Sequence, residues 1–333
     1  SLGHCYDDFL YGGSTIITEP TYFFHYRWKD NYEHWIRDMI FMLSGYYEML
    51  NTIPNLKLTF TLGIHKYHRD VLELLFDKKM EEFTINLHLV NHCYIFKELY
   101  FPYVDYRESF LYKHKPDIPF ELEFIINKLK QKAEPFSKNN YPERVYLSRR
   151  NLNSKTHWHN RTLLNEDEIV DLLTKYGYQE VFSDELSLVD EINIFSNVKK
   201  VVTPIGSGCA NILFSKDSRW FILVNEYYRG NTISLVESYD KRIIYFPKTK
   251  VIKQEGDDTK SGFITNLPYI CDINELYEDL KKFEFLCFNG ATDLHRWKLK
   301  NVGTTEFDQG CFNGATDLHR WKLAGLSEEL SVV

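Results

Sequence analysis

The strongest constraint on the fold is a regular alternation of short apolar runs and amphipathic stretches between residues 144 and 246. Strands are predicted at 144–148, 180–182, 200–203, 220–224 and 242–246, and helices at 165–176, 188–197 and 209–215. Parallel strands need crossover connections, which are usually helices. We therefore predict an α/β fold in which this part of the chain forms a Rossmann-like parallel sheet with crossover helices.

Residues at the predicted helix ends support this assignment. Asn165 is followed three residues later by Glu168, which is the spacing of a capping box. Gly177 stands where a helix-ending glycine is expected, and Ser187 is expected to cap the next helix.

The first part of the chain is a separate block. Its helices are predicted at 32–50, 68–76 and 120–132, and its strands at 56–62 and 84–90. The segment 133–142 holds two prolines and is the best linker candidate. A chain of 333 residues is long enough for about two domains. We assign one domain to 1–138 and another to 139–285.

The last part of the chain contains an internal repeat. The segment 287–299 recurs without change at 311–323. Two copies are too few for a solenoid, so we interpret 286–333 as an appendage outside both domains. Cys287, Asp293 and His295 do not have the spacing of a metal site.

Composition excludes several classes of protein. With 40 Lys and Arg against 47 Asp and Glu, the net charge is −7, so no nucleic-acid partner is expected. No stretch reaches the roughly 18 apolar residues of a spanning helix. The 6 cysteines include no C-x-x-C pair, and their low density favours reduced thiols. We expect the cytoplasm of a bacterial or viral setting, or the secretory lumen if a membrane anchor precedes residue 1.

The turn after the strand at 200–203 is the first candidate site. It contains Pro204, Gly206, Ser207 and Gly208, and a helix with Asn211 follows it. Glycines and a helix N-terminus suit a bound anion at the carboxyl end of a parallel strand. A tight turn without a ligand is the alternative, and the sequence is not that of a P-loop.

The second candidate site is a local concentration of positive charge. Between residues 144 and 161 there are five cations, two histidines and no acidic residue: Arg144, Arg149, Arg150, Lys155, His157, His159 and Arg161. Paired arginines suit a diphosphate. A solvated basic loop is the alternative, but this segment and the glycine turn are predicted at the same edge of one sheet, which favours a phosphate-containing ligand.

The third candidate site is a pair of residues on one helix face. His34 and Asp38 are four residues apart, so a carboxylate can orient an imidazole that acts as a general base. A surface pair without a catalytic role is the alternative. The chain has no D-x-D, G-x-S-x-G, H-E-x-x-H or G-x-G-x-x-G motif.

The three sites, in this order, resemble the signature of glycosyltransferase family 61. That family includes plant xylosyl- and arabinosyltransferases, animal N-acetylglucosaminyltransferases and bacterial capsule proteins. The matching residues are Asn31, Tyr32, His34, Trp35 and Asp38; Ser148, Arg149, Arg150, Arg161, Asn165, Glu166 and Glu168; Gly177 and Tyr178; Glu191; and Pro204, Gly206, Gly208, Asn211 and Phe214. The chain departs from the family at Ile205, where a histidine is usual, and at Ile192, where a glutamine is usual.

The resemblance implies a fold and a reaction. The implied fold is of the GT-B type, with two Rossmann-like domains facing a cleft, the acceptor on 1–138 and the nucleotide sugar on 139–285. The implied enzyme is inverting, needs neither metal nor cofactor, and moves a sugar, expected to be UDP-linked, to a hydroxyl of a glycan or glycoprotein.

The resemblance also implies roles for individual residues. His34 or Asp38 would be the base, and Asn31 and Trp35 would lie on the acceptor side. The donor would be held by Arg149, Arg150, Arg161, Asn165, Glu166, Glu191, Pro204, Gly206, Ser207, Gly208 and Asn211.

Two other functions stay open. One is a catalytically impaired family member that binds glycan or nucleotide as a recognition module, which Ile205 supports. The other is a different nucleotide-binding enzyme on a similar sheet, which the missing dinucleotide fingerprint opposes.

Overall fold

The structure is a computed structural model that describes eleven ranges of the chain. They are 14–25, 30–61, 64–87, 92–102, 120–138, 140–151, 161–215, 217–227, 243–246, 248–253 and 266–285. The duplicated tail lies outside these ranges, as do Lys155, His157 and His159, so the interpretations of them stay predictions.

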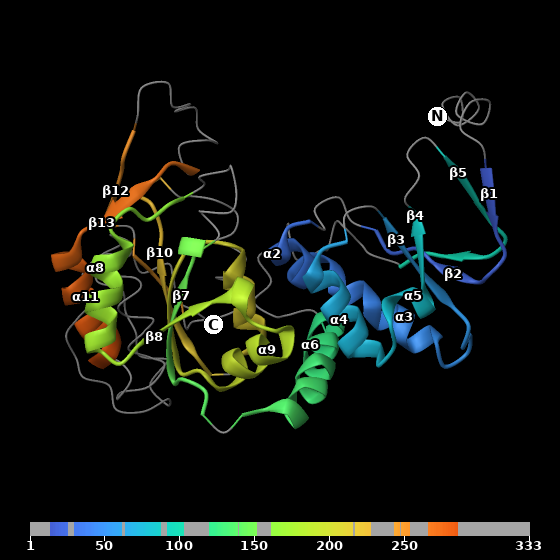
Figure 1. Ribbon diagram of the computed structural model, residues 1–333, viewed down its shortest axis with the longest axis horizontal. Coiled ribbons are helices and arrows are strands. Elements are labelled where there is room, and N and C mark those ends of the chain that lie inside the picture. The colour runs from blue at the N-terminus through green and yellow to red at the C-terminus, as the bar shows by residue number, and fades with distance from the viewer. Residues whose placement is uncertain are drawn as a thin grey trace, which may run out of the picture. The chain divides into compact units, whose positions relative to one another are not determined.

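The chain divides into two compact units (Figure 1). The first comprises Ser1–Asn139, Leu186–Ser196 and Gly206–Phe214, and the second comprises Asn140–Glu185, Asn197–Ile205 and Ser215–Val333. Two segments that the sequence placed in 139–285 therefore group with the first unit. One reason is that the buried Asn193 side chain donates to the carbonyl of Ala133, over 2.9 Å.

A five-stranded sheet forms the second unit, and every pairing in it is parallel. Its strands are β7 (Arg144–Ser148), β8 (Gln179–Phe182), β9 (Lys200–Pro204), β10 (Arg219–Leu223) and β11 (Ile243–Phe246). They lie in the order β11-β10-β9-β7-β8. This is the strand order of a flavodoxin-like sheet, whose topological switch point falls between β7 and β9. The predicted parallel, Rossmann-like sheet is confirmed.

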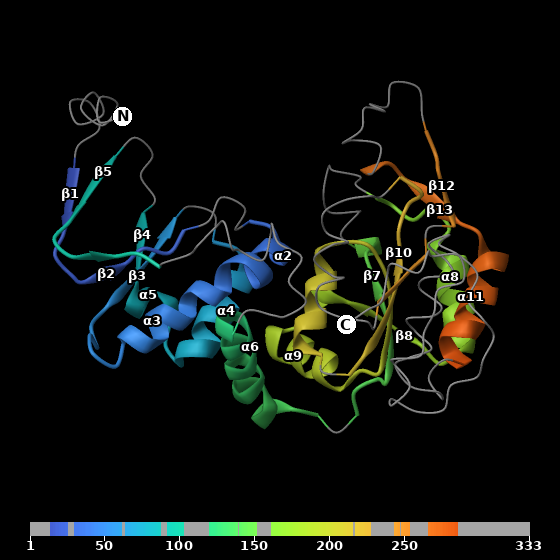
Figure 2. The same ribbon diagram turned by 180° about the vertical axis from the view of Figure 1, so that it is seen from behind.

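Helices α8 (Glu166–Lys175) and α11 (Ile273–Phe285) lie side by side against this sheet (Figures 1 and 2). Their apolar faces and the strands share one core, which includes Ile169, Leu173, Val202, Phe221, Phe246, Leu276 and Phe283. The sequence did not predict α11. It also did not predict the antiparallel pair formed by β12 (Thr249–Val251) and β13 (Tyr269–Cys271).

The helix ends in the second unit follow the sequence only in part. Gly177 has a positive φ of 77° and, with Tyr178, closes the end of α8 through backbone bonds to Thr174 and Leu173. The predicted capping box at Asn165 is wrong, because its side chain makes no cap bond. It instead bonds the backbone of Cys271, donating to the carbonyl over 2.9 Å and accepting from the N–H over 3.0 Å.

The first unit also contains parallel strands. β2 (Thr21–Tyr22), β3 (Lys57–Thr61), β4 (Thr84–Leu87) and β6 (Leu99–Tyr100) form a sheet in the order β4-β3-β2-β6. β1 (Ser14–Ile17) pairs in parallel with β5 (Cys93–Phe96).

Six further helical segments in the described part of the first unit bury apolar side chains. They are α3 (Leu43–Met49), α4 (Lys66–Phe76), α5 (Met80–Phe83), α6 (Phe120–Ala133) and α9 (Leu188–Asn197), with the 3-10 helix η5 (Ser207–Phe214). In α6 the buried residues are Leu122, Ile125, Ile126, Leu129 and Ala133. Ser187 caps α9 as predicted, accepting from the Asp190 N–H over 3.1 Å.

The predicted helix over 32–50 is helical from residue 32 to residue 49 but changes its winding. It consists of α2 (Tyr32–His34), the π-helical turn η1 (Trp35–Met39), the 3-10 turn η2 (Ile40–Met42) and α3. π-helical turns are rare and are frequent at functional sites. Among the described helices, none is long and apolar enough to cross a membrane.

Candidate active site

Asn31 fixes the start of the helical segment that carries the predicted base. Its side-chain oxygen accepts from the N–H groups of Glu33 and His34, over 2.9 and 3.4 Å. It is therefore the N-cap of α2, a role that the acceptor-side prediction did not include.

The π-helical turn that follows is buried along its whole length. Trp35 is fully buried, and its ring meets Phe24, Phe60 and His68 edge-on at centroid distances of 5.6, 6.1 and 4.5 Å. The predicted acceptor-side residue Trp35 thus lies in the core, where it anchors the turn that carries Asp38.

His34 and Asp38 form the predicted pair. The His34 Nδ1 atom lies 2.6 Å from Asp38 Oδ2, and the two side chains are 31% and 3% exposed. A carboxylate only accepts, so the proton between them belongs to Nδ1. In the neutral ring the lone pair is then on Nε2, which is the arrangement of a general base oriented by an acid.

A buried polar chain joins three elements of the first unit. The hydroxyl of Tyr32 donates to Asn211 Oδ1 over 2.8 Å, and Asn211 Nδ2 donates to Glu191 Oε1 over 2.7 Å. Asn211 is 0% and Glu191 6% exposed. Burial, followed by the nearby charge of Glu191, raises the pKa of Tyr32 well above its ordinary value. Glu191 and Asn211, predicted to bind the donor, therefore hold α2, α9 and η5 together.

The second unit brings two predicted sites together at the switch point of its sheet. Arg149 directly follows β7, and its Nη1 atom donates to the carbonyl of Ile205, directly after β9, over 2.5 Å. Ile205 is fully buried, so this position offers no polar side-chain group at the end of β9. Of the predicted basic segment, Arg149 thus meets the start of the predicted glycine turn.

Beyond Ile205 the chain passes into the first unit and turns directly into η5. Gly206 is buried, whereas Ser207 and Gly208 are partly exposed. The Cys209 N–H donates to the carbonyl of Gly206 over 3.0 Å. Among the described glycines only Gly177 has a positive φ, so neither glycine of this turn is required by its backbone angles.

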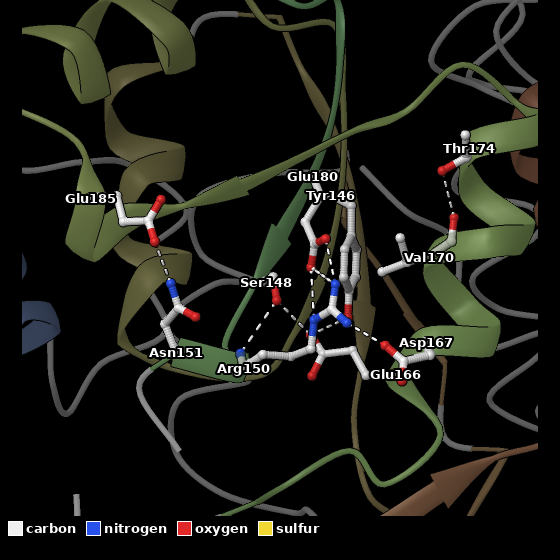
Figure 3. A network of polar contacts seen from close by, with 10 residues as sticks. All are labelled: Tyr146, Ser148, Arg150, Asn151, Glu166, Asp167, Val170, Thr174, Glu180 and Glu185. Carbon is white, nitrogen blue, oxygen red and sulfur yellow. Dashed lines mark hydrogen bonds and ion pairs between the residues drawn. The ribbon is translucent and has the colours of Figure 1, made fainter. Parts of the chain in front are cut away.

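Arg150 lies among the carboxylates of Glu166, Asp167 and Glu180 (Figure 3). Its Nε and Nη2 atoms donate to Oε1 and Oε2 of Glu180 on β8, over 3.0 and 2.5 Å, and its Nη1 atom makes a further ion pair with Asp167 on α8. Two carboxylates thus neutralise this arginine, which ties the end of β7 to β8 and α8.

Glu166 lies beside this network and is 4% exposed. Its Oε1 atom accepts from the hydroxyls of Tyr146 and Ser148, both over 2.8 Å. Burial raises the pKa of the Glu166 carboxyl, and these hydrogen bonds oppose the rise. Like Asn165, it holds strands and helix ends in place.

Arg161 carries the one strained backbone angle among the predicted site residues. Its φ is 62°, in the left-handed region that non-glycine residues rarely adopt, and its N–H donates to the carbonyl of Asn266 over 2.7 Å. Burial raises the pKa of Tyr269, and the charges of Arg149 and Arg161 oppose that rise.

Comparison with known families decides the class of protein. The sequence model of the family described as Glycosyltransferase 61 matches residues 32–222, more than half of the chain. This chain belongs to glycosyltransferase family 61. The matched region includes every residue assigned above to the three candidate sites except Asn31. A search of curated proteins found no match.

The protein is therefore a glycosyltransferase, and its sites are divided between the two units. The His34–Asp38 pair lies in the first unit, and Arg149, Arg161 and Pro204 lie in the second. Within the described ranges, no three or more His, Cys, Asp or Glu side chains form a group that could hold a metal ion.

Two charged residues beside His34 and Asp38 were not predicted from the sequence of this glycosyltransferase. Arg37 contacts both members of the His34–Asp38 pair, and Glu33 contacts Arg37. Their signal was available in the spacing, since Glu33 and Arg37 are four residues apart, like His34 and Asp38.

Proposed function

We propose that this glycosyltransferase is inverting and metal-independent, with a UDP-sugar as donor and a hydroxyl of a glycan or glycoprotein as acceptor. His34 is the base, oriented by Asp38. The observation that carries the proposal is the 2.6 Å contact between His34 Nδ1 and the buried Asp38 carboxylate, because it leaves the Nε2 lone pair of the neutral ring as the proton acceptor.

The donor diphosphate is held by Arg149 and Arg161, together with backbone N–H groups of the turn at Gly206, Ser207 and Gly208. Arg149 lies at the switch point of a parallel sheet, which is where such sheets bind ligands. Arg150 contributes by fixing β7, since Glu180 and Asp167 already neutralise it. The two units are proposed to have the GT-B arrangement, and the setting to be cytoplasmic.

The reaction is a direct displacement at the anomeric carbon. As the acceptor oxygen forms its bond to that carbon, its proton passes to Nε2 of His34, and the bond from the carbon to the diphosphate oxygen breaks. Negative charge then develops on the leaving diphosphate, where the guanidinium groups stabilise it. A single displacement inverts the configuration of the sugar.

A glycan- or nucleotide-binding module is the second candidate, and Ile205 is the observation that favours it. Because its side chain is fully buried, it offers the donor no polar group at a position where the family usually has histidine. Such a protein would bind the donor without transferring the sugar.

Calorimetric titration with UDP and a panel of UDP-sugars, followed by transfer assays on a glycan panel, tests the proposal. Arg149→Gln should weaken UDP binding about 10- to 100-fold, because a hydrogen bond to a charged group contributes about 1.5–3 kcal/mol. Lys199→Gln is the matched control, since Lys199 directly precedes β9 and therefore lies at the edge of the parallel sheet opposite to Arg149. Equal affinity of UDP for Arg149→Gln and wild type would contradict the proposed donor site. UDP binding without any transfer would favour the binding module.

A further inference from the structure

Arg37 holds the carboxylate of Asp38 in a fork. Its Nε atom donates to Oδ1 over 2.5 Å, and its Nη2 atom donates to Oδ2 over 2.7 Å. Both carboxylate oxygens are therefore engaged, and Oδ2 is the same atom that His34 Nδ1 contacts. A bidentate pair of this kind fixes the plane of a carboxylate as well as its position.

Glu33 holds the same arginine from the other side. Its Oε1 atom accepts from Arg37 Nη1 over 2.5 Å, and the Arg37 side chain is only 5% exposed. A buried guanidinium between two carboxylates is compensated in charge, so the arrangement does not leave an isolated ion. Glu33, Arg37, Asp38 and His34 thus form a continuous series of contacts.

The fork lies within the π-helical turn. Arg37 and Asp38 are adjacent in sequence, and adjacent side chains do not face each other on an α-helix. Both residues lie in the π-helical turn, where their side chains meet. A rare winding and a buried fork therefore occur together, next to His34.

We propose that Arg37, held by Glu33, is a positioning residue that fixes the Asp38 carboxylate and, through it, the orientation and tautomer of His34. The 2.6 Å contact between Nδ1 and Oδ2 requires a proton between the two atoms, since two lone pairs at that distance would repel. Arg37 Nη2 also lies 3.2 Å from His34 Nδ1, but a guanidinium only donates, so the fixed Oδ2 atom is the acceptor that keeps the proton on Nδ1 and the lone pair on Nε2. The consequence for sugar transfer rests on the proposed role of His34 as the base.

Nitrogen-15 NMR of histidine-labelled protein tests the positioning role without any substrate. The His34 signals are assigned by their loss in His34→Ala. Wild type should show His34 with its proton on Nδ1, and Arg37→Lys should show a mixture of tautomers, because lysine keeps the charge but has no fork. A wild-type His34 signal in Arg37→Lys would overturn the proposal.

A second variant covers the case in which Arg37→Lys does not fold. Glu33→Gln/Arg37→Gln keeps the net charge of the cluster and leaves no unpaired Glu33, and it should show the same mixture of tautomers. A wild-type signal in this variant would likewise overturn the proposal. Arg69→Gln is the matched control, because Arg69 pairs with Glu73 at the same spacing on α4 but is 40% exposed. It should leave the His34 signal unchanged.

Kinetics then separate positioning from general stability. In Arg37→Lys, kcat for transfer should fall about 10- to 100-fold with KM unchanged. This loss is smaller than the roughly 10²–10⁴-fold that a general base contributes, because His34 is still present but is less well oriented. In a His34→Ala background the same substitution should cause no further loss, since Arg37 acts through His34. A further loss in that background would contradict the positioning role. Full transfer activity of His34→Ala would instead contradict the proposed base and leave the tautomer result intact.

Discussion

Glu166 and Asp38 are both buried carboxylates, but their partners differ in charge. Two neutral hydroxyls, of Tyr146 and Ser148, donate to Glu166. Asp38 instead meets the cation of Arg37 through both of its oxygens. Neutral donors compensate the burial of a negative charge less than a guanidinium does. At the residue scale, burial raises the pKa of the Glu166 carboxyl, so its ionisation opposes folding.

We predict that Glu166→Gln changes how stability depends on pH. Burial raises the pKa of Glu166 above its usual 4.5, so the native state binds this proton more tightly than the unfolded state does. The resulting stabilisation is present below the unfolded pKa and is lost as pH rises through the raised pKa. The amide of the variant does not titrate but can still accept both hydroxyl hydrogen bonds. Urea titrations at several pH values should show wild type losing stability relative to Glu166→Gln as pH rises above about 4.5. A difference that is constant with pH would contradict this account.

Arg150 gives a second prediction at this scale. Because it is paired with Glu180 and Asp167, Arg150→Gln should lower the free energy of unfolding by about 1 kcal/mol, as expected for a partly exposed ion pair. UDP affinity should stay within about twofold of wild type, in contrast to Arg149→Gln. Chemical denaturation and calorimetry measure the two quantities. A loss of UDP affinity as large as that of Arg149→Gln would show that both arginines bind the diphosphate.

At the scale of elements, the first unit depends on polar bonds between helices that are distant in sequence. Tyr32 at the start of α2, Asn211 in η5 and Glu191 in α9 form one buried chain. Every buried member of such a chain needs its partner, because an unsatisfied polar group in the core is costly. These hydrogen bonds explain why α9 and η5 group with the first unit, although β9, which lies between them in sequence, belongs to the second.

We predict that Tyr32→Phe destabilises the protein by about 1–3 kcal/mol, because Asn211 loses the hydroxyl that donates to its buried oxygen. Tyr47→Phe is the matched control. Tyr47 lies in α3 and packs on Phe76 and Phe124 through its ring, so its substitution should change stability by less than about 0.5 kcal/mol. Urea unfolding of both variants measures the difference. Equal stability of Tyr32→Phe and wild type would mean that the hydrogen bond from Tyr32 to Asn211 does not stabilise the fold.

At the scale of the whole molecule, the sequence predicted the parallel sheet of the second unit well because its strands are short and strongly apolar. Runs such as Val145, Tyr146 and Leu147 are buried from both sides and have few other ways to fold. The convergence of Arg149 with the start of the glycine turn then followed from strand order alone, since both follow parallel neighbours.

What the sequence did not predict depends on partners that are far away along the chain. Asn165 has the spacing of a capping box. Its side chain instead forms hydrogen bonds with the backbone of Cys271, more than a hundred residues later. The helical periodicity over 32–50 predicts a regular α-helix and gives no sign of the π-helical turn. The features found at that turn, the packing of Trp35 and the Arg37 fork, are visible only in the structure. Local patterns therefore predicted the elements, whereas tertiary contacts decided the caps, the winding and the buried bonds.

The most direct test of the account is the single-turnover rate of sugar transfer by His34→Ala, measured together with its affinity for UDP. His92→Ala is the control, since His92 is bonded to the exposed Thr15 in the small β1–β5 region. If His34 is the base, transfer should fall about 10²–10⁴-fold while the Kd for UDP stays within about twofold of wild type. A wild-type transfer rate in His34→Ala would contradict the account, and so would a loss of UDP affinity that matches the loss of rate.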